Sequence, residues 1–204
     1  RIVAGGKWSG IDCIEFNHVN RFVLDHCDFS GGTDGTLDIT SCTRYTLSWS
    51  TVANSAYCCN DHGGSLLSYA PTSYVSLHHN VWAHHESRCG GWFHWGGKKG
   101  EATDNGMIDY RNNICYDAKN YMFVTRSKTP VHANVVGNWF IAGPNTPVSK
   151  YRSKTIWKMV ALQPAVAFAK DNIMVDHENK HYDDRVKKRI GKVIEKPWPM
   201  PKVT

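Results

Sequence analysis

Self-similar β-rich segments recur along this chain and constrain its fold more than any other feature. The three that match best are FVLDHCDFS (22–30), YTLSWSTVA (45–53) and VSLHHNVWA (75–83), and MIDYRNNICY (107–116) and HANVVGNWFIAG (132–143) match more loosely. The aligned starts Phe22, Tyr45, Val75 and Met107 are 23, 30 and 32 residues apart. A coil of parallel strands with rungs of similar length and loops of variable length gives such spacing. We therefore expect residues one turn apart to be neighbours in space.

The strand pattern leaves one other architecture open. Apolar residues alternate with polar ones before residue 150, as in Leu47 and Trp49, and clusters of the type GG, DG, PT and NG bound these runs. A sandwich of hairpins would show two-residue turns every 8–12 residues. Asp34-Gly35 is compatible with such a turn. Both architectures are all-β, and we favour the coil.

An asparagine recurs at one place in the later repeats. Asn80, Asn113 and Asn138 each precede two residues suited to a core, namely Val81-Trp82, Ile114-Cys115 and Trp139-Phe140. Stacked on successive turns, their amides would hydrogen-bond along the axis of the coil. Three unrelated turn asparagines are the alternative. The matched context favours the ladder.

Length and composition fit one globular domain over residues 1–204. We place the coil at about residues 10–149 and read residues 150–204 as an extended, irregular arm packed on it, because that segment is basic and ends in Pro197, Pro199 and Pro201. No stretch reaches the roughly 20 apolar residues that span a bilayer. The sequence opens RIVAGGKW, without an initiator Met or a signal peptide, and is compatible with a fragment of a longer chain.

Charge is divided unevenly along the chain. Residues 1–118 hold 8 Lys and Arg against 12 Asp and Glu, whereas residues 119–204 hold 16 against 6. The basic half is either a solvated face or a surface that attracts a polyanion. Because no nucleic-acid motif is present and the aromatic residues do not interleave with the basic ones, we expect no nucleic-acid partner. We also expect no membrane partner and a monomer.

Three aspartates have the spacing of a metal site. Asp12 and Asp34 are 22 residues apart, about one turn of the proposed coil, and adjacent strands of such a stack lie about 4.8 Å apart. Asp34 and Asp38 are an even number of residues apart and would share one face of a strand. Three converging carboxylates repel one another, and Ca²⁺ would offset that repulsion with oxygen ligands in irregular geometry. Ordinary turn aspartates are the alternative.

These segments resemble the pectate lyase family of secreted polysaccharide lyases. The resemblance rests on DCIEFNHVNRFVLDHCDFSGGTDGTLDIT, on YTLSWS and on VSLHHNVWAHHESR. Its specific elements are Asp25-His26 at the end of a strand, an acidic residue four before Asp38, and His78-His79-Asn80 followed by Arg88. The resemblance covers about residues 10–90 well and 105–145 more thinly, and the terminal PWPMP also fits.

The resemblance implies a right-handed parallel β-helix, secretion, and a calcium-dependent lyase that cleaves polygalacturonate by β-elimination. By matching position, Asp12, Asp34 and Asp38 would be the Ca²⁺ ligands and Arg88 the catalytic base. The candidate substrate-binding residues are His62, His85, Trp92 and Lys98. Trp92 would stack on a sugar face or be a core aromatic residue. His84, His85 and His94 are easier bases by chemistry, although each is also compatible with a packing role.

The chain also departs from the family pattern. The family commonly has a proline and a second arginine after the catalytic arginine, and CGGWFHWGG stands there instead. The usual lysine after the SWS strand is absent, and AYCCNDHGG takes its place. Two other functions therefore stay open: a non-catalytic β-helix that binds acidic glycans, and a lyase for another uronide such as alginate. A polygalacturonase ranks last because no hydrolase signature is seen.

Overall fold

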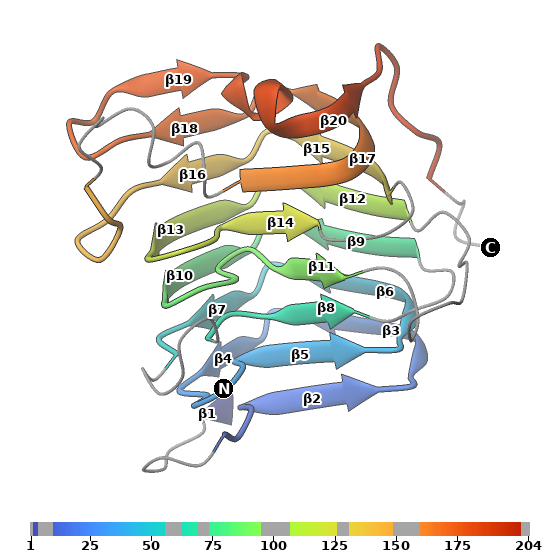
Figure 1. Ribbon diagram of the computed structural model, residues 1–204. Coiled ribbons are helices and arrows are strands. Elements are labelled where there is room, and N and C mark those ends of the chain that lie inside the picture. The colour runs from blue at the N-terminus through green and yellow to red at the C-terminus, as the bar shows by residue number, and fades with distance from the viewer. Residues whose placement is uncertain are drawn as a thin grey trace.

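The structure is a computed structural model that describes residues 2–3, 10–55, 63–68, 74–94, 107–125, 131–148 and 160–200. This described part of the chain is all-β, with parallel strands in two curled sheets and a single 3₁₀ helix, η1 (Arg185–Arg189). Figure 1 shows the strands stacked one above another from the N-terminal end to the C-terminal end. The all-β expectation is confirmed.

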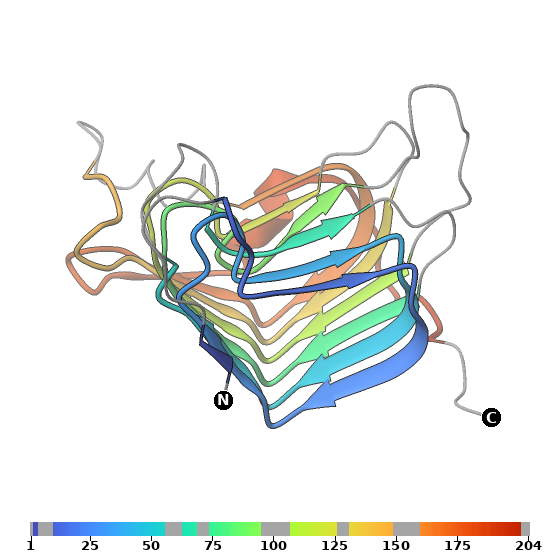
Figure 2. The same cartoon turned by 90° about the horizontal axis from the view of Figure 1, so that it is seen from below.

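Most strands fall into three stacks that receive one strand from each successive turn; β19 adds an antiparallel partner for β18 at the end of stack A, and β20 pairs with β17. Stack A contains β1 (Ile2–Val3), β4 (Asp28–Ser30), β7 (Thr51–Ala53), β10 (Val81–His85), β13 (Ile114–Ala118), β16 (Trp139–Ile141), β18 (Ile173–Val175) and β19 (His181–Asp183). Stack B contains β2 (Ile14–Asn17), β5 (Leu37–Thr40), β8 (Leu66–Ser68), β11 (Trp92–His94), β14 (Phe123–Thr125) and the first part of β17 (Val160–Lys170). Stack C contains β3 (Asn20–Asp25), β6 (Thr43–Ser48), β9 (Tyr74–His78), β12 (Met107–Arg111), β15 (Val131–Val136) and the rest of β17. Figure 2 looks along the stacks and shows successive turns lying over one another.

The register confirms that residues one turn apart are neighbours. Phe22 pairs with Tyr45 and Tyr45 with Val75, as the repeats predict, but Val75 pairs with Ile108 rather than with Met107. All pairs between strands of successive turns are parallel in the described chain, and only β18 and β19 pair in the antiparallel sense. The hairpin sandwich is therefore wrong. Asp34 and Gly35 lead into a parallel strand and do not form a two-residue hairpin.

The core consists of columns of side chains that point inward from each stack. In stack C the paired residues Leu47, Leu77, Tyr110, Val135 and Ala169 are buried one above another. In stack A the column is Val52, Trp82, Cys115, Phe140 and Met174. Such columns bury a continuous apolar interior, because each turn covers the one below it. Of these positions, the alternation in the sequence indicated Leu47, and the residues after the asparagines indicated Trp82, Cys115 and Phe140; Trp49, which the alternation also indicated, lies at a corner and is 56% exposed.

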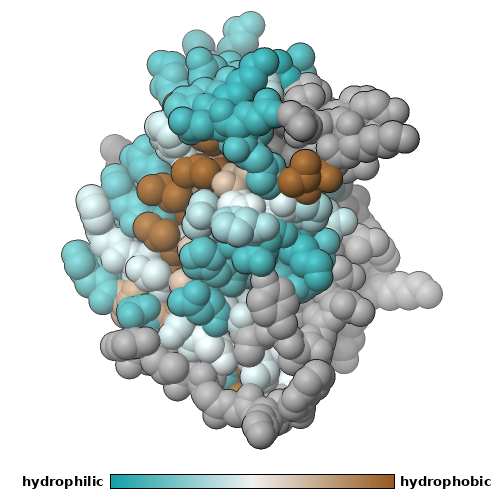
Figure 3. Space-filling model, turned by 90° about the vertical axis from the view of Figure 1, so that its left-hand side faces the viewer, coloured by the Kyte–Doolittle hydropathy of each residue, from teal (hydrophilic) through white to brown (hydrophobic). Residues whose placement is uncertain are grey.

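Outward-facing apolar residues form a column on stack A. Val81 pairs with Ile114 and Ile114 with Trp139, and all three are partly exposed. Figure 3 shows apolar side chains gathered on this face of the molecule.

The corner between stacks C and A is held by the predicted asparagine ladder. The side-chain amide of Asn80 donates to Oδ1 of Asn113 at 3.0 Å, and that of Asn113 donates to Oδ1 of Asn138 at 3.1 Å. The ladder continues from Asn138 to Asn172 at 3.0 Å, a member that the sequence prediction did not include. At the other end, Ser50 donates its backbone N–H to Oδ1 of Asn80 at 3.0 Å. These amides are buried, and their donors and acceptors are satisfied along the axis.

The prediction that residues 150–204 form an irregular arm is wrong for most of the described part of that segment. Strand β17 pairs with β14 through Val160–Leu162 and with β15 through Ala165–Lys170, so it belongs to two stacks. Strand β20 (Ile190–Val193) then pairs with β17. The apolar run VALQPAVAFA carries this strand signal, but a proline stands inside it, where a continuous central strand is not expected.

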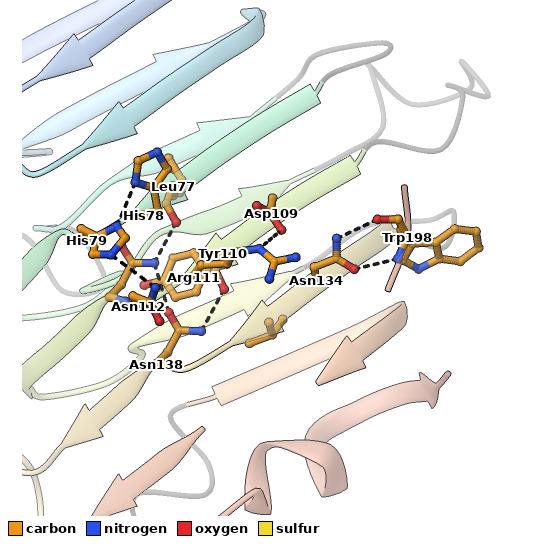
Figure 4. A network of polar contacts seen from close by, with 12 residues as sticks. Leu77, His78, His79, Asp109, Tyr110, Arg111, Asn112, Asn134, Asn138 and Trp198 are labelled. Atoms are coloured by element: carbon orange, nitrogen blue, oxygen red, sulfur yellow. Dashed lines mark hydrogen bonds and ion pairs between the residues drawn. The ribbon is translucent and has the colours of Figure 1, made fainter. Parts of the chain in front are cut away.

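An extended arm does exist at residues 194–200, where no strand or helix occurs. The backbone N–H of Trp198 donates to Oδ1 of Asn134 at 2.8 Å, and Nδ2 of Asn134 donates to the Trp198 carbonyl at 3.0 Å. The Trp198 ring stacks on His132 with centroids 3.9 Å apart, and its Nε1 donates to the Val166 carbonyl. Figure 4 shows the two bonds between Asn134 and Trp198. The proline-rich end therefore lies on stack C.

Candidate active site

Asp12 and Asp38 come from successive turns of the chain and meet at Gly35. Asp12 lies just before β2, and Asp38 is the second residue of β5. Oδ1 of Asp12 accepts the Gly35 N–H at 2.7 Å. A Cβ atom added to Gly35 would lie 2.8 Å from this Oδ1 and 2.7 Å from Cγ of Asp38. Only a residue without a side chain fits between the two carboxylates.

Asp34 is the third aspartate near this pair, and its charge acts on both Asp12 and Asp38. It comes immediately before Gly35, and its backbone N–H donates to the Ile11 carbonyl at 3.2 Å. Its Oδ2 atom would be 3.7 Å from a Cβ at Gly10, which lies two residues before Asp12. The three aspartates thus lie in two adjacent segments, 10–12 and 34–38, as their spacing predicted.

The negative charges act on one another. The pKa of Asp38 is raised to about 7, mainly by burial and to a smaller extent by Asp12 and Asp34, against the opposing effects of the Leu66 N–H and Arg88. Burial also raises the pKa of Asp12, assisted by Asp34 and Glu15, while the Gly35 N–H and Arg88 oppose the shift. When partly buried carboxylates raise one another's pKa, a cation bound between them stabilises their ionised forms.

Arg88 supplies positive charge to the same place. It lies between β10 and β11 with a φ of 57°, and its carbonyl accepts the N–H of Ser65 at 3.1 Å and that of Gly91 at 3.1 Å. Its guanidinium lowers the pKa of both Asp12 and Asp38, so it lies within electrostatic range of the two carboxylates. Arg88 therefore acts electrostatically on two of the three aspartates that the sequence grouped with it.

The fit of Ca²⁺ to this place is a matter of donors and of their arrangement. Carboxylate oxygens are the donors that Ca²⁺ prefers. Oδ1 of Asp12 and Oδ1 of Asp38 each accept one backbone N–H, from Gly35 and Leu66, and each carboxylate has a second oxygen. Within the described ranges, no group of three or more His, Cys, Asp or Glu side chains has the arrangement of a metal site. The donor types fit Ca²⁺, and the three side chains would need to close together around it.

The predicted substrate contacts divide into three cases. His85 is fully buried, and its Nε2 lies 2.9 Å from the Val52 carbonyl, so its position does not support contact with a polysaccharide. Burial lowers the pKa of His85 to about 4 and keeps the ring neutral. Trp92 begins β11, but its side chain lies outside the described part of the structure. His62 and Lys98 also lie outside the described residues.

Two ion pairs made by residues shortly before Arg88 in the sequence were not foreseen. Nζ of Lys119 lies 2.5 Å from Oε1 of the buried Glu86, and Lys119 is half exposed. Nδ1 of His84 lies 2.8 Å from Oδ2 of Asp117, and side-chain and backbone N–H groups of Asn145 also donate to that carboxylate. The sequence analysis named His84 as a possible base, and it counted Lys119 among the basic residues of the C-terminal half. Their partners lie about 33 residues away and only the register brings them together.

The bond to His84 and those from Asn145 lower the pKa of Asp117 in spite of its burial. This carboxylate therefore stays ionised and orients the His84 ring, whose side chain is about half exposed. A histidine oriented by a buried aspartate can accept or donate a proton at its other nitrogen.

Comparison with protein-family models finds no match, and comparison with curated proteins finds none either. The resemblance to pectate lyases therefore rests on the sequence motifs. In the described part of the chain, no helix is long and apolar enough to cross a membrane.

Proposed function

We propose that this chain is a secreted, calcium-dependent pectate lyase that cleaves polygalacturonate by β-elimination and releases unsaturated oligogalacturonides. The observation that carries the proposal is the meeting of Asp12 and Asp38 at Gly35 within electrostatic range of Arg88. We further propose that the stacked parallel strands form a right-handed parallel β-helix. Three stacks that each take one strand per turn support this fold.

Asp12, Asp34 and Asp38 would hold the calcium ion. Bound there, Ca²⁺ would neutralise the uronate carboxylate next to the scissile bond and make the adjacent C–H more acidic. The residues around Asp38 are compatible with this occupancy, because burial, followed by the charges of Asp12 and Asp34, raises its pKa to about 7 and a bound cation would offset both effects. A polyanionic substrate also needs cations; Arg88 acts on Asp12 and Asp38, and we propose Lys119, which pairs with Glu86 two residues before Arg88, as a second.

Arg88 would take the proton from C5 of the uronate. A guanidinium is protonated through the ordinary pH range, so the reaction should be fastest at alkaline pH. Lys119 would orient a neighbouring uronate carboxylate, in place of the lysine that the family pattern has after the SWS strand. The backbone N–H of Lys119 donates to the His85 carbonyl of the preceding turn at 3.1 Å. This bond holds the Lys119 backbone next to the segment that leads to Arg88.

The test is the ultraviolet absorbance of the new double bond when the purified chain is given polygalacturonate. Activity should require added Ca²⁺, disappear with chelator, and disappear in Arg88→Gln with the thermal melting curve unchanged. A substrate panel that includes alginate identifies the uronide. Product formation that continues in chelator, or in Arg88→Gln, would refute the proposed chemistry.

A second function is a non-catalytic β-helix that binds acidic glycans. The observation that favours it is the open arrangement of the three aspartates in the described chain, together with the missing second arginine. Retention on immobilised polygalacturonate without any unsaturated product, at every calcium concentration, would support this function over the lyase.

A further inference from the structure

Two histidines next to each other in the sequence point the same way at the end of β9. His78 is the last residue of that strand, and His79 has a φ of 58°, in the left-handed region. In an extended strand, neighbouring side chains point to opposite faces. The left-handed corner at His79 turns the chain before the buried Asn80, so both imidazole rings come to the outside of the same corner. Figure 4 shows the two rings side by side.

The two rings face each other through the same type of nitrogen. Nδ1 of His78 lies 3.1 Å from Nδ1 of His79, and the rings are nearly perpendicular, at 87°. On its other side, Nε2 of His79 lies 3.3 Å from Nδ2 of Asn112, one turn further along. With this amide orientation Nε2 accepts, so His79 carries its proton on Nδ1 and donates it to His78. One proton is thus shared between two imidazoles.

The separation of the two nitrogens suits one metal ion as well as one proton. With metal–nitrogen distances of about 2.0–2.1 Å, a nitrogen–nitrogen distance of 3.1 Å corresponds to an angle of about 100° at the metal. This value lies between the square-planar and the tetrahedral angle. Imidazole nitrogen is the donor that Cu²⁺, Ni²⁺ and Zn²⁺ favour, whereas Ca²⁺ prefers oxygen. Because the two Nδ1 atoms face each other along a hydrogen bond, both rings would rotate to direct their lone pairs at a common point.

Two carboxylates act on His78, but the net effect of its surroundings keeps the ring neutral, which is the form that binds a metal ion. Asp25 and Asp109 both raise the pKa of His78, although burial and His79 lower it on balance. Oδ1 of Asp25 accepts from Ser48, and Asp109 pairs with Arg111 at 2.6 Å, so both carboxylates are held in place. The His79 ring also stacks on the exposed Trp49, with centroids 4.3 Å apart and planes at 10°.

We propose that His78 and His79 form a surface site for a divalent transition-metal ion, with both Nδ1 atoms as ligands and water in the other positions. Metal binding moves the proton of His79 to Nε2, which must then donate. Asn112 supports that state when its amide is turned by 180°, so that Oδ1 accepts from Nε2, as outer hydrogen-bond partners of histidine ligands do. With two protein ligands, the site is smaller than a closed metal centre.

The site is tested by titrating the chain with NiCl₂ and following heat and Trp fluorescence, with CuCl₂ and ZnCl₂ in parallel. We expect one ion per chain and quenching by Ni²⁺ and Cu²⁺ that weakens in Trp49→Phe, since the Trp49 ring lies on a ligand. His78→Ala and His79→Asn should abolish the binding, and asparagine is chosen at 79 because it tolerates a positive φ. His18→Ala, which removes another exposed histidine at positive φ, should bind as the wild type does.

Asn112→Asp distinguishes the proposed site from nonspecific binding of metal to surface histidines. A carboxylate at 112 accepts from Nε2 of His79 without an amide rotation, so we expect roughly tenfold tighter Ni²⁺ binding. Melting curves in chelator establish that each variant is folded. Wild-type affinity in His78→Ala and His79→Asn, or no binding by the wild type, would overturn the proposal. None of these measurements depends on lyase activity, and all are repeated with Ca²⁺ present.

Discussion

The side-chain amide of Asn113 donates to Oδ1 of Asn138 at 3.1 Å and to the Leu77 carbonyl at 2.9 Å, inside the fully buried corner between stacks C and A. Oδ1 of Asn113 in turn accepts from both the backbone and the side chain of Asn80. One side chain therefore serves three successive turns, and the corner depends on it.

Replacing this residue, in Asn113→Ala, should destabilise the protein by about 3 kcal/mol, because buried donors on Asn80 and the Leu77 carbonyl lose a partner. Urea denaturation measures the loss. Asn17→Ala removes an exposed asparagine from β2 and should change the unfolding free energy by less than about 0.5 kcal/mol. Equal effects of the two variants would mean that the ladder does not stabilise the corner.

The pKa of Asp38 predicts how stability varies with pH. Its pKa is about 7 in the folded chain, above the ordinary value of 3.8, so unfolding releases a proton between these limits. Without metal, the contribution of Asp38 to the unfolding free energy should therefore be most favourable below pH 4 and decline as the pH rises to about 7, with a limiting slope of about 1.4 kcal/mol per pH unit. Denaturation at several pH values in chelator, compared with Asp38→Asn, isolates this dependence. A slope that is identical in Asp38→Asn would assign the effect to other groups.

Calcium should reverse that dependence. A ligand that binds only the folded chain stabilises it, and the ionised carboxylates that bind Ca²⁺ are most abundant above pH 7. We expect added Ca²⁺ to raise the melting temperature at pH 8 much more than at pH 5. Asp12→Asn and Asp38→Asn should each remove the shift, and Mg²⁺ at the same concentration serves as the ion control. A shift of the same size in these variants would place the calcium elsewhere.

Gly35 is predicted to be indispensable to the site. A Cβ there would lie 2.8 Å from Oδ1 of Asp12, closer than a carbon atom normally approaches an oxygen, so Gly35→Ala must separate the carboxylates. We expect it to weaken calcium binding and lower lyase activity at saturating substrate. At Gly10 the nearest atom to an added Cβ is Oδ2 of Asp34 at an ordinary 3.7 Å, so Gly10→Ala is the matched control. Unchanged calcium affinity in Gly35→Ala would contradict the arrangement.

The C-terminal arm should protect stack C. Trp198→Ala removes the ring that stacks on His132 and donates to the Val166 carbonyl, at a cost of about 2 kcal/mol or more in unfolding free energy. Limited proteolysis should then cleave the arm faster than in the wild type. Trp139→Ala, at a partly exposed position of stack A, should leave the rate of cleavage unchanged.

The sequence predicted those parts of the fold in which the same residue types recur in the same order from turn to turn. Asn80, Asn113 and Asn138 could be recognised because each precedes two apolar residues, of which the structure buries only the second, and the same pattern follows Asn172 in Ile173-Met174. Asn172 was missed because the basic composition after residue 150 suggested an arm. The strand in VALQPAVAFA was missed because a proline interrupts it.

The site could be predicted in part for the same reason. A separation of 22 residues, close to one turn, brings Asp12 to the segment of Asp34 and Asp38. The pairs Glu86–Lys119 and His84–Asp117 could not be predicted, since each spans about one turn whose length varies with its loop. The burial of His85 was also beyond the sequence, because its neighbour His84 has the same residue type and is partly exposed.

The most direct test of the central claim compares the wild type with Asp38→Asn and Arg88→Gln on polygalacturonate, with Ca²⁺ and with chelator, by the absorbance of the unsaturated product. The proposed enzyme predicts product only for the wild type with Ca²⁺. Product from the wild type in chelator, or from either variant at the wild-type rate, would contradict a lyase site in which these carboxylates and Arg88 act together.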